Sequence, residues 1–228
     1  MPQKTLFRDS MYMKTRILFV GNSFTARNNL PNLLAQLVEA GGKGTLEWKL
    51  VSTGGASLRQ HFNKGDVAAL LRDASWDAVV LQEQSTLPAK NAARMADNVR
   101  DLNALVGQAS ARTILYMTWA QADAPETQTA ISAAYANSGQ QVDATVVPAG
   151  LAWQLCLVQE PQIILHDKDG SHPTLAGSYL AACAFYKVLF ASRAKKIPTL
   201  DIAVSEAGQI ALQECARQAV SAFRKGAF

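Results

Sequence analysis

The sequence predicts an α/β protein: a three-layer α/β/α sandwich on a five-stranded parallel sheet, flavodoxin-like in arrangement. Short apolar runs of β-rich composition alternate along the chain with longer segments of helical period. This alternation is typical of β-α units, in which helices connect parallel strands. The chain has 228 residues, 49% of them hydrophobic, which is enough for a sizeable core.

The elements are predicted in order from these runs. Strands are expected at 16–21, 45–51, 78–82, 113–117 and 144–147. Helices are expected between them at 30–40, 67–72, 89–108 and 127–138, followed by two more at 174–191 and 204–223, with a short helix around His61. Each connection is long enough for a right-handed crossover.

One domain is expected, from residue 16 to residue 228. Residues 1–15 are interpreted as an N-terminal extension, because Met11 and Met13 directly precede the first predicted strand. The first fifteen residues lack the apolar core of a signal peptide, and no later segment approaches the roughly 18 apolar residues of a membrane span. The sequence therefore favours a cytoplasmic protein without a membrane partner.

The charge distribution argues against nucleic acid as a partner. The net charge is +4 and the pI is near 9.0, but Lys and Arg are scattered along the chain. The one modest cluster is formed by Arg193, Lys195 and Lys196.

No metal or cofactor is expected. The three cysteines, Cys156, Cys183 and Cys215, lack paired spacing and are interpreted as buried small hydrophobic residues of a reducing compartment. The three histidines show no metal-binding spacing. The Gly-Gly-Lys-Gly segment at 41–44 follows a helix and not a strand, so it is interpreted as a helix end and turn and not as a phosphate loop.

Two short motifs carry the predicted chemistry. A Gly-Asn-Ser-Phe-Thr segment at 21–25 ends the first apolar run, and Asp-Gly-Ser-His-Pro at 169–173 lies far downstream. Ser23 would be exposed where a buried strand ends, His172 would take its proton, and Asp169 would orient the imidazole. Taken alone, Ser23 would be interpreted as a helix cap or a loop serine, but its place at a strand end together with the Asp-x-x-His motif favours a catalytic role.

Local sequence supports the downstream motif. Gly170 permits a sharp turn that returns the carboxylate towards the ring, and Pro173 excludes a helical backbone at His172 while suiting the first position of the next helix. His166 and Asp167 form a competing pair that could replace His172 and Asp169 or line the pocket rim.

The other strand ends also carry polar residues, at 52–57, 82–85 and 118–121. Ligands of such sheets bind outside the carboxyl ends of the strands. Gly54 and Gly55 allow a backbone with positive φ that could donate an N–H to a ligand. Trp119 either lines a substrate pocket or packs into the core.

With these motifs the chain resembles the SGNH (GDSL-type) hydrolase superfamily over about residues 16–189. The resemblance implies nucleophile Ser23, base His172 and orienting Asp169. It also implies an oxyanion hole formed by the backbone N–H groups of Ser23 and Gly55 and by a side-chain amide after the third strand.

Two positions depart from the superfamily pattern. Asn22 stands where the family usually has Asp, and Gln82-Glu83-Gln84 stands in place of Gly-x-Asn. We assign the third oxyanion donor to Gln84, with Gln82 as the second choice. Asn22 and Gln82 are then candidate substrate contacts, together with Trp119.

The sequence therefore predicts a serine esterase that uses no cofactor and hydrolyses a small or carbohydrate-linked acetyl-type ester. Within enzymes, a thioesterase or lysophospholipase is the alternative. A catalytically silent α/β domain that binds a carbohydrate or a protein is the alternative from another class.

Overall fold

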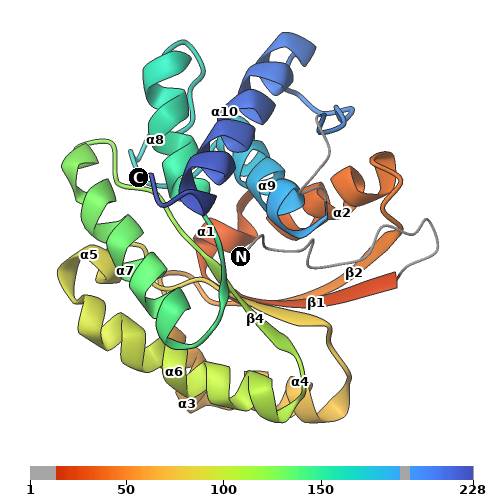
Figure 1. Ribbon diagram of the computed structural model, residues 1–228, viewed down its shortest axis with the longest axis vertical. Coiled ribbons are helices and arrows are strands. Elements are labelled where there is room, and N and C mark those ends of the chain that lie inside the picture. The colour runs from red at the N-terminus through yellow and green to blue at the C-terminus, as the bar shows by residue number, and fades with distance from the viewer. Residues whose placement is uncertain (1–13, 191–195, 228) are drawn as a thin grey trace. The chain divides into compact units, whose positions relative to one another are not determined.

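The computed structural model describes residues 14–190 and 196–227 (Figure 1). Its single sheet is formed by β1 (Lys14–Gly21), β2 (Thr45–Ser52), β3 (Ala78–Leu81), β4 (Arg112–Tyr116) and β5 (Thr145–Val147), in the order β2-β1-β3-β4-β5. β1 pairs in parallel with β3, and β3 with β4. All five predicted strands are present, within two residues of their predicted ends.

The strand order confirms the predicted fold class. The connection from β1 to β2 runs across the sheet in the opposite direction from the later connections, so right-handed crossovers distribute helices to both faces. The order is that of flavodoxin-like sheets, whose direction changes between β1 and β3. The loops after these two strands are where a ligand site is expected.

The middle strands form the core of the sheet. Residues 17–20 of β1 and every residue of β3 are fully buried, as expected for strands covered on both faces. β2 lies at an edge, and its exposed residues mostly alternate with half-buried ones, Leu46 being buried. Lys14 and Glu47 form an exposed ion pair of 2.5 Å beside this edge.

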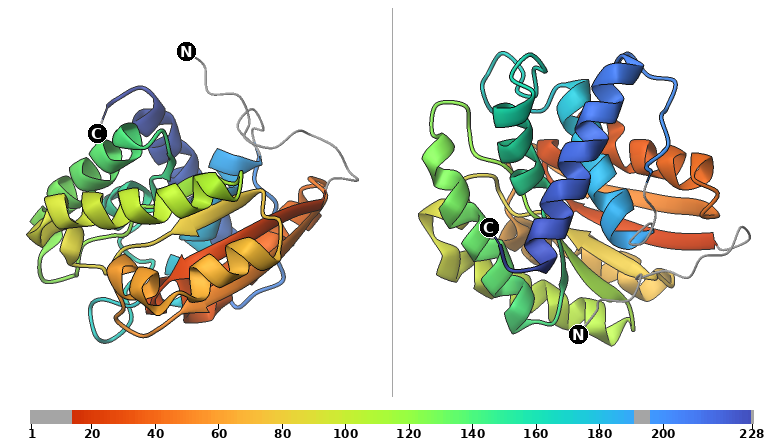
Figure 2. Two further views of the ribbon diagram at one scale, coloured as in Figure 1. Left: turned by 90° about the horizontal axis from the view of Figure 1, so that it is seen from below. Right: turned by 45° about the horizontal axis from the view of Figure 1, so that its top comes forward.

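The described chain divides into two compact units, which we call the strand unit and the C-terminal unit. Of the described residues, the strand unit contains 16–26 and 48–146, and the C-terminal unit contains 14–15, 27–47, 147–190 and 196–227. The strands lie side by side in both views of Figure 2.

In the strand unit, the helices are α1 (Ser23–Ala26), α3 (Leu58–Lys64), α4 (Asp66–Asp73), α5 (Leu87–Lys90), α6 (Ala92–Gln108), η2 (Pro125–Thr127) and α7 (Gln128–Gln141). α6 packs against α3, α5 and α7. The single helix predicted at 89–108 is wrong, because the chain breaks into α5 and α6. Asn91 has an extended backbone there, and its side chain accepts a hydrogen bond from Arg94 N to cap α6.

In the C-terminal unit, the helices are η1 (Arg27–Asn29), α2 (Leu30–Ala40), α8 (Ala149–Gln159), α9 (Leu175–Leu189) and α10 (Glu206–Arg224). α10 packs against α9 and α8, and α9 against α2 (Figure 1). α2 begins and ends as predicted, and the segment at 41–44 forms its C-terminal turn. α8 was not predicted.

The N-terminal boundary needs one correction. β1 begins at Lys14, so Lys14 and Thr15 belong to the sheet and not to the predicted extension at 1–15. The rest of that extension lies outside the described residues, as do Arg193 and Lys195 of the basic cluster. The prediction of one domain over 16–228 stays a prediction.

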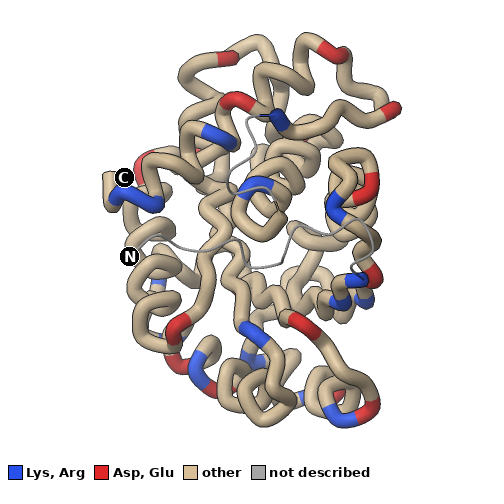
Figure 3. The backbone as a smooth tube through the Cα atoms, turned by 45° about the vertical axis from the view of Figure 1, so that its right-hand side comes forward, with Lys and Arg blue, Asp and Glu red and all other residues tan. Residues whose placement is uncertain are grey.

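Acidic and basic residues alternate along the described chain without a long run of either sign (Figure 3). Within residues 14–190 and 196–227, no helix is both long enough and apolar enough to cross a membrane.

Candidate active site

Ser23 opens a single-turn helix directly after β1. Asn22 caps this helix: its Oδ1 accepts from Phe24 N at 3.0 Å, and its backbone carbonyl accepts from Thr25 N at 3.0 Å. Ser23 is partly exposed, whereas Asn22 and Phe24 on either side of it are buried. The local geometry therefore presents the predicted nucleophile on a turn whose neighbours are fixed, which we call the serine turn (residues 22–25).

Gln82 holds the serine turn from the end of β3. Its Oε1 accepts from Asn22 N at 2.8 Å and from Thr25 Oγ1 at 2.9 Å, while its Nε2 donates to the Glu83 carbonyl. Gln82 is 0% exposed. The side chain thus satisfies three buried polar groups that water does not reach.

The prediction that Asn22 and Gln82 contact substrate is wrong. Asn22 is 2% exposed, and its Nδ2 donates to the Ala56 carbonyl at 3.1 Å while its Oδ1 caps α1. Both amides are engaged inside the protein, so they shape the serine turn and leave no surface for a ligand. Gln82 is excluded as an oxyanion donor for the same reason.

Trp119 packs into the core beneath the serine turn. It is 2% exposed, and its ring stacks on Phe24 with centroids 4.8 Å apart. Tyr116 contacts the same indole at a tilted angle, with centroids 6.4 Å apart. Of the two interpretations offered by the sequence, the structure therefore favours core packing, and the assignment of Trp119 as a substrate contact is wrong.

The loop after β2 contains the predicted glycine donor. Gly55 is exposed and has φ of +67°, as the sequence predicted, while Gly54 does not adopt positive φ. The loop is tied to the serine turn by the bond from Asn22 Nδ2 to Ala56 and by Thr53 N, which donates to the Gly21 carbonyl at 3.4 Å. The role of the Gly55 N–H in an oxyanion hole stays a prediction.

His61 supports the serine turn from α3. Its Nε2 lies 2.7 Å from the Gly21 carbonyl, which can only accept, so Nε2 carries the proton. Burial lowers the pKa of His61, and the bond to Gly21 opposes this effect. His61 is therefore a neutral structural residue of the described fold.

Gln84 has its side-chain carbonyl anchored and its amide nitrogen available. Oε1 accepts from Thr86 N at 3.0 Å, Thr86 Oγ1 at 3.1 Å and Leu87 N at 2.9 Å, at the start of α5. Gln84 is half-buried, and Nε2 makes no hydrogen bond with the described residues. A donor oriented in this way suits an oxyanion, which stays the predicted role of Gln84.

Glu83 is a buried carboxylate that sequence analysis missed. Oε1 accepts from Gln84 N at 2.7 Å and from Leu58 N at 3.0 Å, while Oε2 accepts from Asn98 Nδ2 at 2.8 Å. Arg59 extends the network by donating from Nε to Asn98 Oδ1 at 3.1 Å. Glu83 therefore fixes the backbone at Gln84 to α3 and α6. A carboxylate directly after a buried strand was the available signal.

Asp169 and His172 form a preassembled pair in the C-terminal unit. His172 Nδ1 lies 2.5 Å from Asp169 Oδ2, and Asp169 Oδ1 accepts from the backbone N–H groups of Ser171 and His172 at 3.0 and 2.9 Å. Gly170 has φ of +69°, so the predicted sharp turn is confirmed. The backbone and side-chain hydrogen bonds from His172 lower the pKa of Asp169, and the backbone of Ser171 adds to this effect. The carboxylate is therefore charged at neutral pH, which fixes the proton on Nδ1.

Residues 166–173, which we call the Asp-His loop, are closed at their base. His166 and Pro173 form a β-bridge, and Asp167 N donates to the His172 carbonyl at 2.7 Å. α9 begins only at Leu175, with Thr174 as its cap, so the prediction that Pro173 opens the helix is wrong. Pro173 instead belongs to the bridge.

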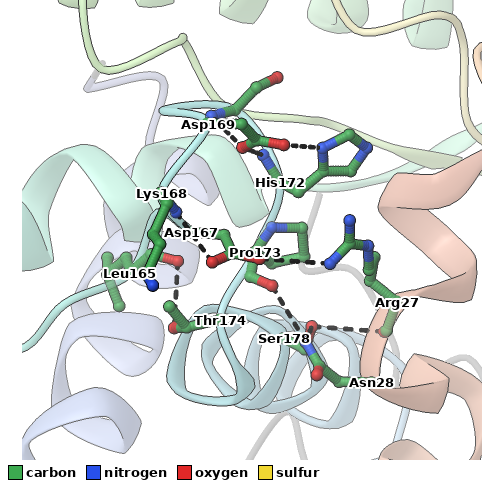
Figure 4. A network of polar contacts seen from close by, with 11 residues as sticks. Arg27, Asn28, Leu165, Asp167, Lys168, Asp169, His172, Pro173, Thr174 and Ser178 are labelled. Atoms are coloured by element: carbon green, nitrogen blue, oxygen red, sulfur yellow. Dashed lines mark hydrogen bonds and ion pairs between the residues drawn. The ribbon is translucent and has the colours of Figure 1, made fainter.

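His166 and Asp167, the competing pair, each contact other residues of the C-terminal unit. The His166 ring packs edge-on against Trp153, with centroids 4.8 Å apart. Asp167 Oδ2 accepts from Arg27 Nη1 at 3.2 Å, and its Oδ1 accepts from Lys168 N at 2.8 Å (Figure 4). Asp169 is the carboxylate that faces a histidine ring.

The cysteines are buried and none forms a disulfide, as predicted. Within the described residues there is no group of three or more His, Cys, Asp or Glu side chains that could hold a metal ion.

Solved structures share this fold over most of the chain. A DUF4886 family protein from Bacteroides uniformis superposes with a TM-score of 0.77 at 21% identity, covering 95% of this chain and 97% of that one. A protein from Slackia heliotrinireducens assigned to the SGNH hydrolases superposes with a TM-score of 0.67 at 29% identity, covering 77% and 99%. The chain has the fold of the SGNH (GDSL-type) hydrolase superfamily. An acetyl-xylooligosaccharide esterase from Geobacillus shares this SGNH fold, with a TM-score of 0.58 at 16% identity and coverage of 77% and 94%.

Sequence comparison alone did not give this result. No protein-family model matches the chain, and no curated protein matches it. The SGNH fold is therefore recognised through its strand order and its structural neighbours.

Proposed function

We propose that the protein is a serine esterase that hydrolyses a small or carbohydrate-linked acetyl-type ester through an acyl-enzyme on Ser23. The observation that carries the proposal is the Asp169–His172 pair, held at 2.5 Å on a closed loop with the carboxylate charged. The structural neighbours, which include several esterases and acylhydrolases, support an ester-acting hydrolase.

In the first half of the proposed reaction, Ser23 Oγ attacks the ester carbonyl carbon and His172 Nε2 accepts the hydroxyl proton. Asp169 keeps the other ring proton on Nδ1 and stabilises the imidazolium that forms. The carbon–oxygen bond to the alcohol then breaks, and His172 returns the proton to the departing alkoxide. In the second half, water attacks the acyl-enzyme with His172 as base and releases the acid and Ser23.

The oxyanion formed in both halves is assigned three donors: the backbone N–H groups of Ser23 and Gly55 and Nε2 of Gln84. Support for Gln84 comes from its anchored Oε1 and from the Glu83 carboxylate, which holds the Gln84 backbone. Loss of one such donor typically lowers kcat by about 10²–10³-fold.

The proposed acetyl preference is supported by the order of the elements. Within residues 14–190 and 196–227, no apolar insertion that could build a long acyl channel interrupts the β-α units. The likeness to an acetyl-xylooligosaccharide esterase makes acetylated sugars the first natural substrates to test. The reaction as written uses no cofactor.

The test is hydrolysis of p-nitrophenyl acetate, butyrate and octanoate by the parent protein and by Ser23→Ala, His172→Ala and Asp169→Asn. We expect activity to be strongest on acetate and to fall by about 10³-fold or more in each variant. Ser221→Ala, which changes an exposed serine on α10, serves as a matched control that keeps parental activity.

A serine-directed phosphonate gives an independent readout. Labelling of the peptide that contains Ser23, abolished in Ser23→Ala and slowed in His172→Ala, would support the activated nucleophile. Parental activity in Ser23→Ala would refute the mechanism. A parent that neither hydrolyses these esters nor reacts with the phosphonate would instead favour the silent binding domain.

A further inference from the structure

We propose that Asn28 is a positioning residue for His172, which it holds through the backbone carbonyl of Pro173. The inference rests on the proposed function, because it assigns Asn28 a part in placing the catalytic base. It concerns contacts within the C-terminal unit, and Figure 4 labels the residues that make them.

Asn28 contacts the residue next to the proposed base. Its Nδ2 donates to the Pro173 carbonyl at 3.1 Å and to Ser178 Oγ at 2.9 Å. Ser178 is buried on α9, and its hydroxyl donates in turn to the Arg27 carbonyl at 3.4 Å. The amide of Asn28 therefore connects the end of the Asp-His loop to α9, and Ser178 connects α9 back to the carbonyl of Arg27, the residue before Asn28.

Arg27 holds the other end of the same loop. Its Nη1 donates to Asp167 Oδ2 at 3.2 Å, and Asp167 N donates to the His172 carbonyl at 2.7 Å. The consecutive residues Arg27 and Asn28 thus bind the two ends of the Asp-His loop. Figure 4 shows Arg27 and Asn28 reaching the loop from one side.

The backbone at this position favours asparagine over most other residues. Asn28 and Asn29 have φ of 52° and 51°, in the left-handed region that asparagine tolerates better than most residues. Asn29 caps α2 without a side-chain hydrogen bond, so the two neighbours share a backbone conformation but differ in their contacts. Asn29 is therefore a close internal control for Asn28.

The position in the chain gives the contact its functional meaning. Asn28 follows Ser23 by five residues and lies in η1, the short helix after α1, and its side chain binds the loop that carries the proposed base. The segment that bears the nucleophile is thus covalently continuous with the residue that holds the Asp-His loop. Because a displacement of about 1 Å in catalytic geometry can cost about 10²-fold in rate, loss of this contact should act on kcat.

The experiment compares Asn28→Asp with Asn29→Asp. Both changes add one negative charge and keep a side chain that tolerates positive φ, but only the first removes a donor to Pro173. We expect kcat on p-nitrophenyl acetate to fall about tenfold or more in Asn28→Asp, with KM within about twofold of the parent. Rates are compared on the alkaline plateau of the pH profile, so that an effect of the added charge on His172 protonation is not counted.

A second pair, Asn28→Gly and Asn29→Gly, removes the side chain without adding charge. Amide hydrogen exchange of peptides spanning residues 165–174 reports on the loop without any need for activity. We expect faster exchange there in Asn28→Gly than in Asn29→Gly, while the exchange of α10 stays parental in both.

The outcomes separate the two proposals. Parental kcat in both Asn28 variants would overturn this inference while leaving the esterase proposal intact, even if exchange in the loop increases. Equal exchange in the two glycine variants would overturn it as well. If the parent lacks activity that depends on Ser23, the proposed function fails first and the positioning role fails with it.

Discussion

Replacement of Gln82 by methionine tests whether this buried amide shapes the serine turn. The change keeps the side-chain length but removes the partner of three buried groups: Asn22 N–H, the Thr25 hydroxyl and the Glu83 carbonyl. Each orphaned buried group costs about 1–3 kcal/mol. Partial relaxation brings the sum towards the lower end, so we expect the free energy of unfolding to fall by about 3 kcal/mol.

The matched control is Gln209→Met. Gln209 is also a buried glutamine with three hydrogen bonds, one from Leu200 N and two to the carbonyls of Leu200 and Val204. Its partners are only partly buried and can rebind water, so we expect a loss of about 1–3 kcal/mol. Because these partners lie in the segment before α10 and belong to neither the serine turn nor the Asp-His loop, kcat should stay parental.

Urea denaturation measures stability, and p-nitrophenyl acetate hydrolysis at a temperature where all variants are folded measures activity. We expect Gln82→Met to lower kcat about tenfold or more, with KM nearly unchanged. A Gln82→Met protein within 1 kcal/mol of the parent, with raised KM and parental kcat, would refute the reasoning and return Gln82 to the role of a substrate contact.

Two further predictions concern pH and packing. Burial lowers the pKa of His61, so the unfolded chain binds more protons than the folded chain as pH falls below about 6.5, and the free energy of unfolding decreases there. We expect urea denaturation at each pH to show a smaller decrease between pH 7 and 5 for His61→Gln than for the parent. A Cβ at Gly177 would lie 2.4 Å from Trp153 Cζ2, so Gly177→Ala should lower the free energy of unfolding by about 1–3 kcal/mol. Gly107 is a helical glycine with open space around its Cβ position, so Gly107→Ala should raise the free energy of unfolding by about 0.5–1 kcal/mol. Thermal denaturation of both variants checks these values.

Periodicity and composition were sufficient for the sheet. The middle strands β1 and β3 are short apolar runs, and their burial on both faces leaves no polar alternation to confuse the assignment. Periodicity and composition were less informative for α8, because its apolar residues are distributed around the helix. Trp153 and Cys156 are fully buried, while Leu157 and Val158 are exposed. Without an amphipathic stripe, its periodic signal is weak.

In the candidate site, local sequence predicted some residues correctly, while contacts between distant residues could not be predicted. The Asp-His turn is local, so Asp169, Gly170 and His172 could be interpreted from their spacing alone. Whether a side-chain amide is buried depends on hydrogen-bond partners that lie far away in the sequence. Gln82 and Asn22, for example, are 60 positions apart. For this reason the sequence indicated polar residues at the correct strand ends but assigned two of them to substrate.

The capping of α5 by Gln84 has a consequence for binding entropy. A glutamine side chain has one more rotatable bond than asparagine, and fixing a long polar side chain costs up to about 1.5–2 kcal/mol. Here three donors from Thr86 and Leu87 hold Oε1 in the folded protein, so that this freedom is lost during folding. Binding of a ligand that accepts a hydrogen bond from Nε2 therefore costs little further side-chain entropy at Gln84. In this respect the glutamine behaves like a shorter, more rigid asparagine.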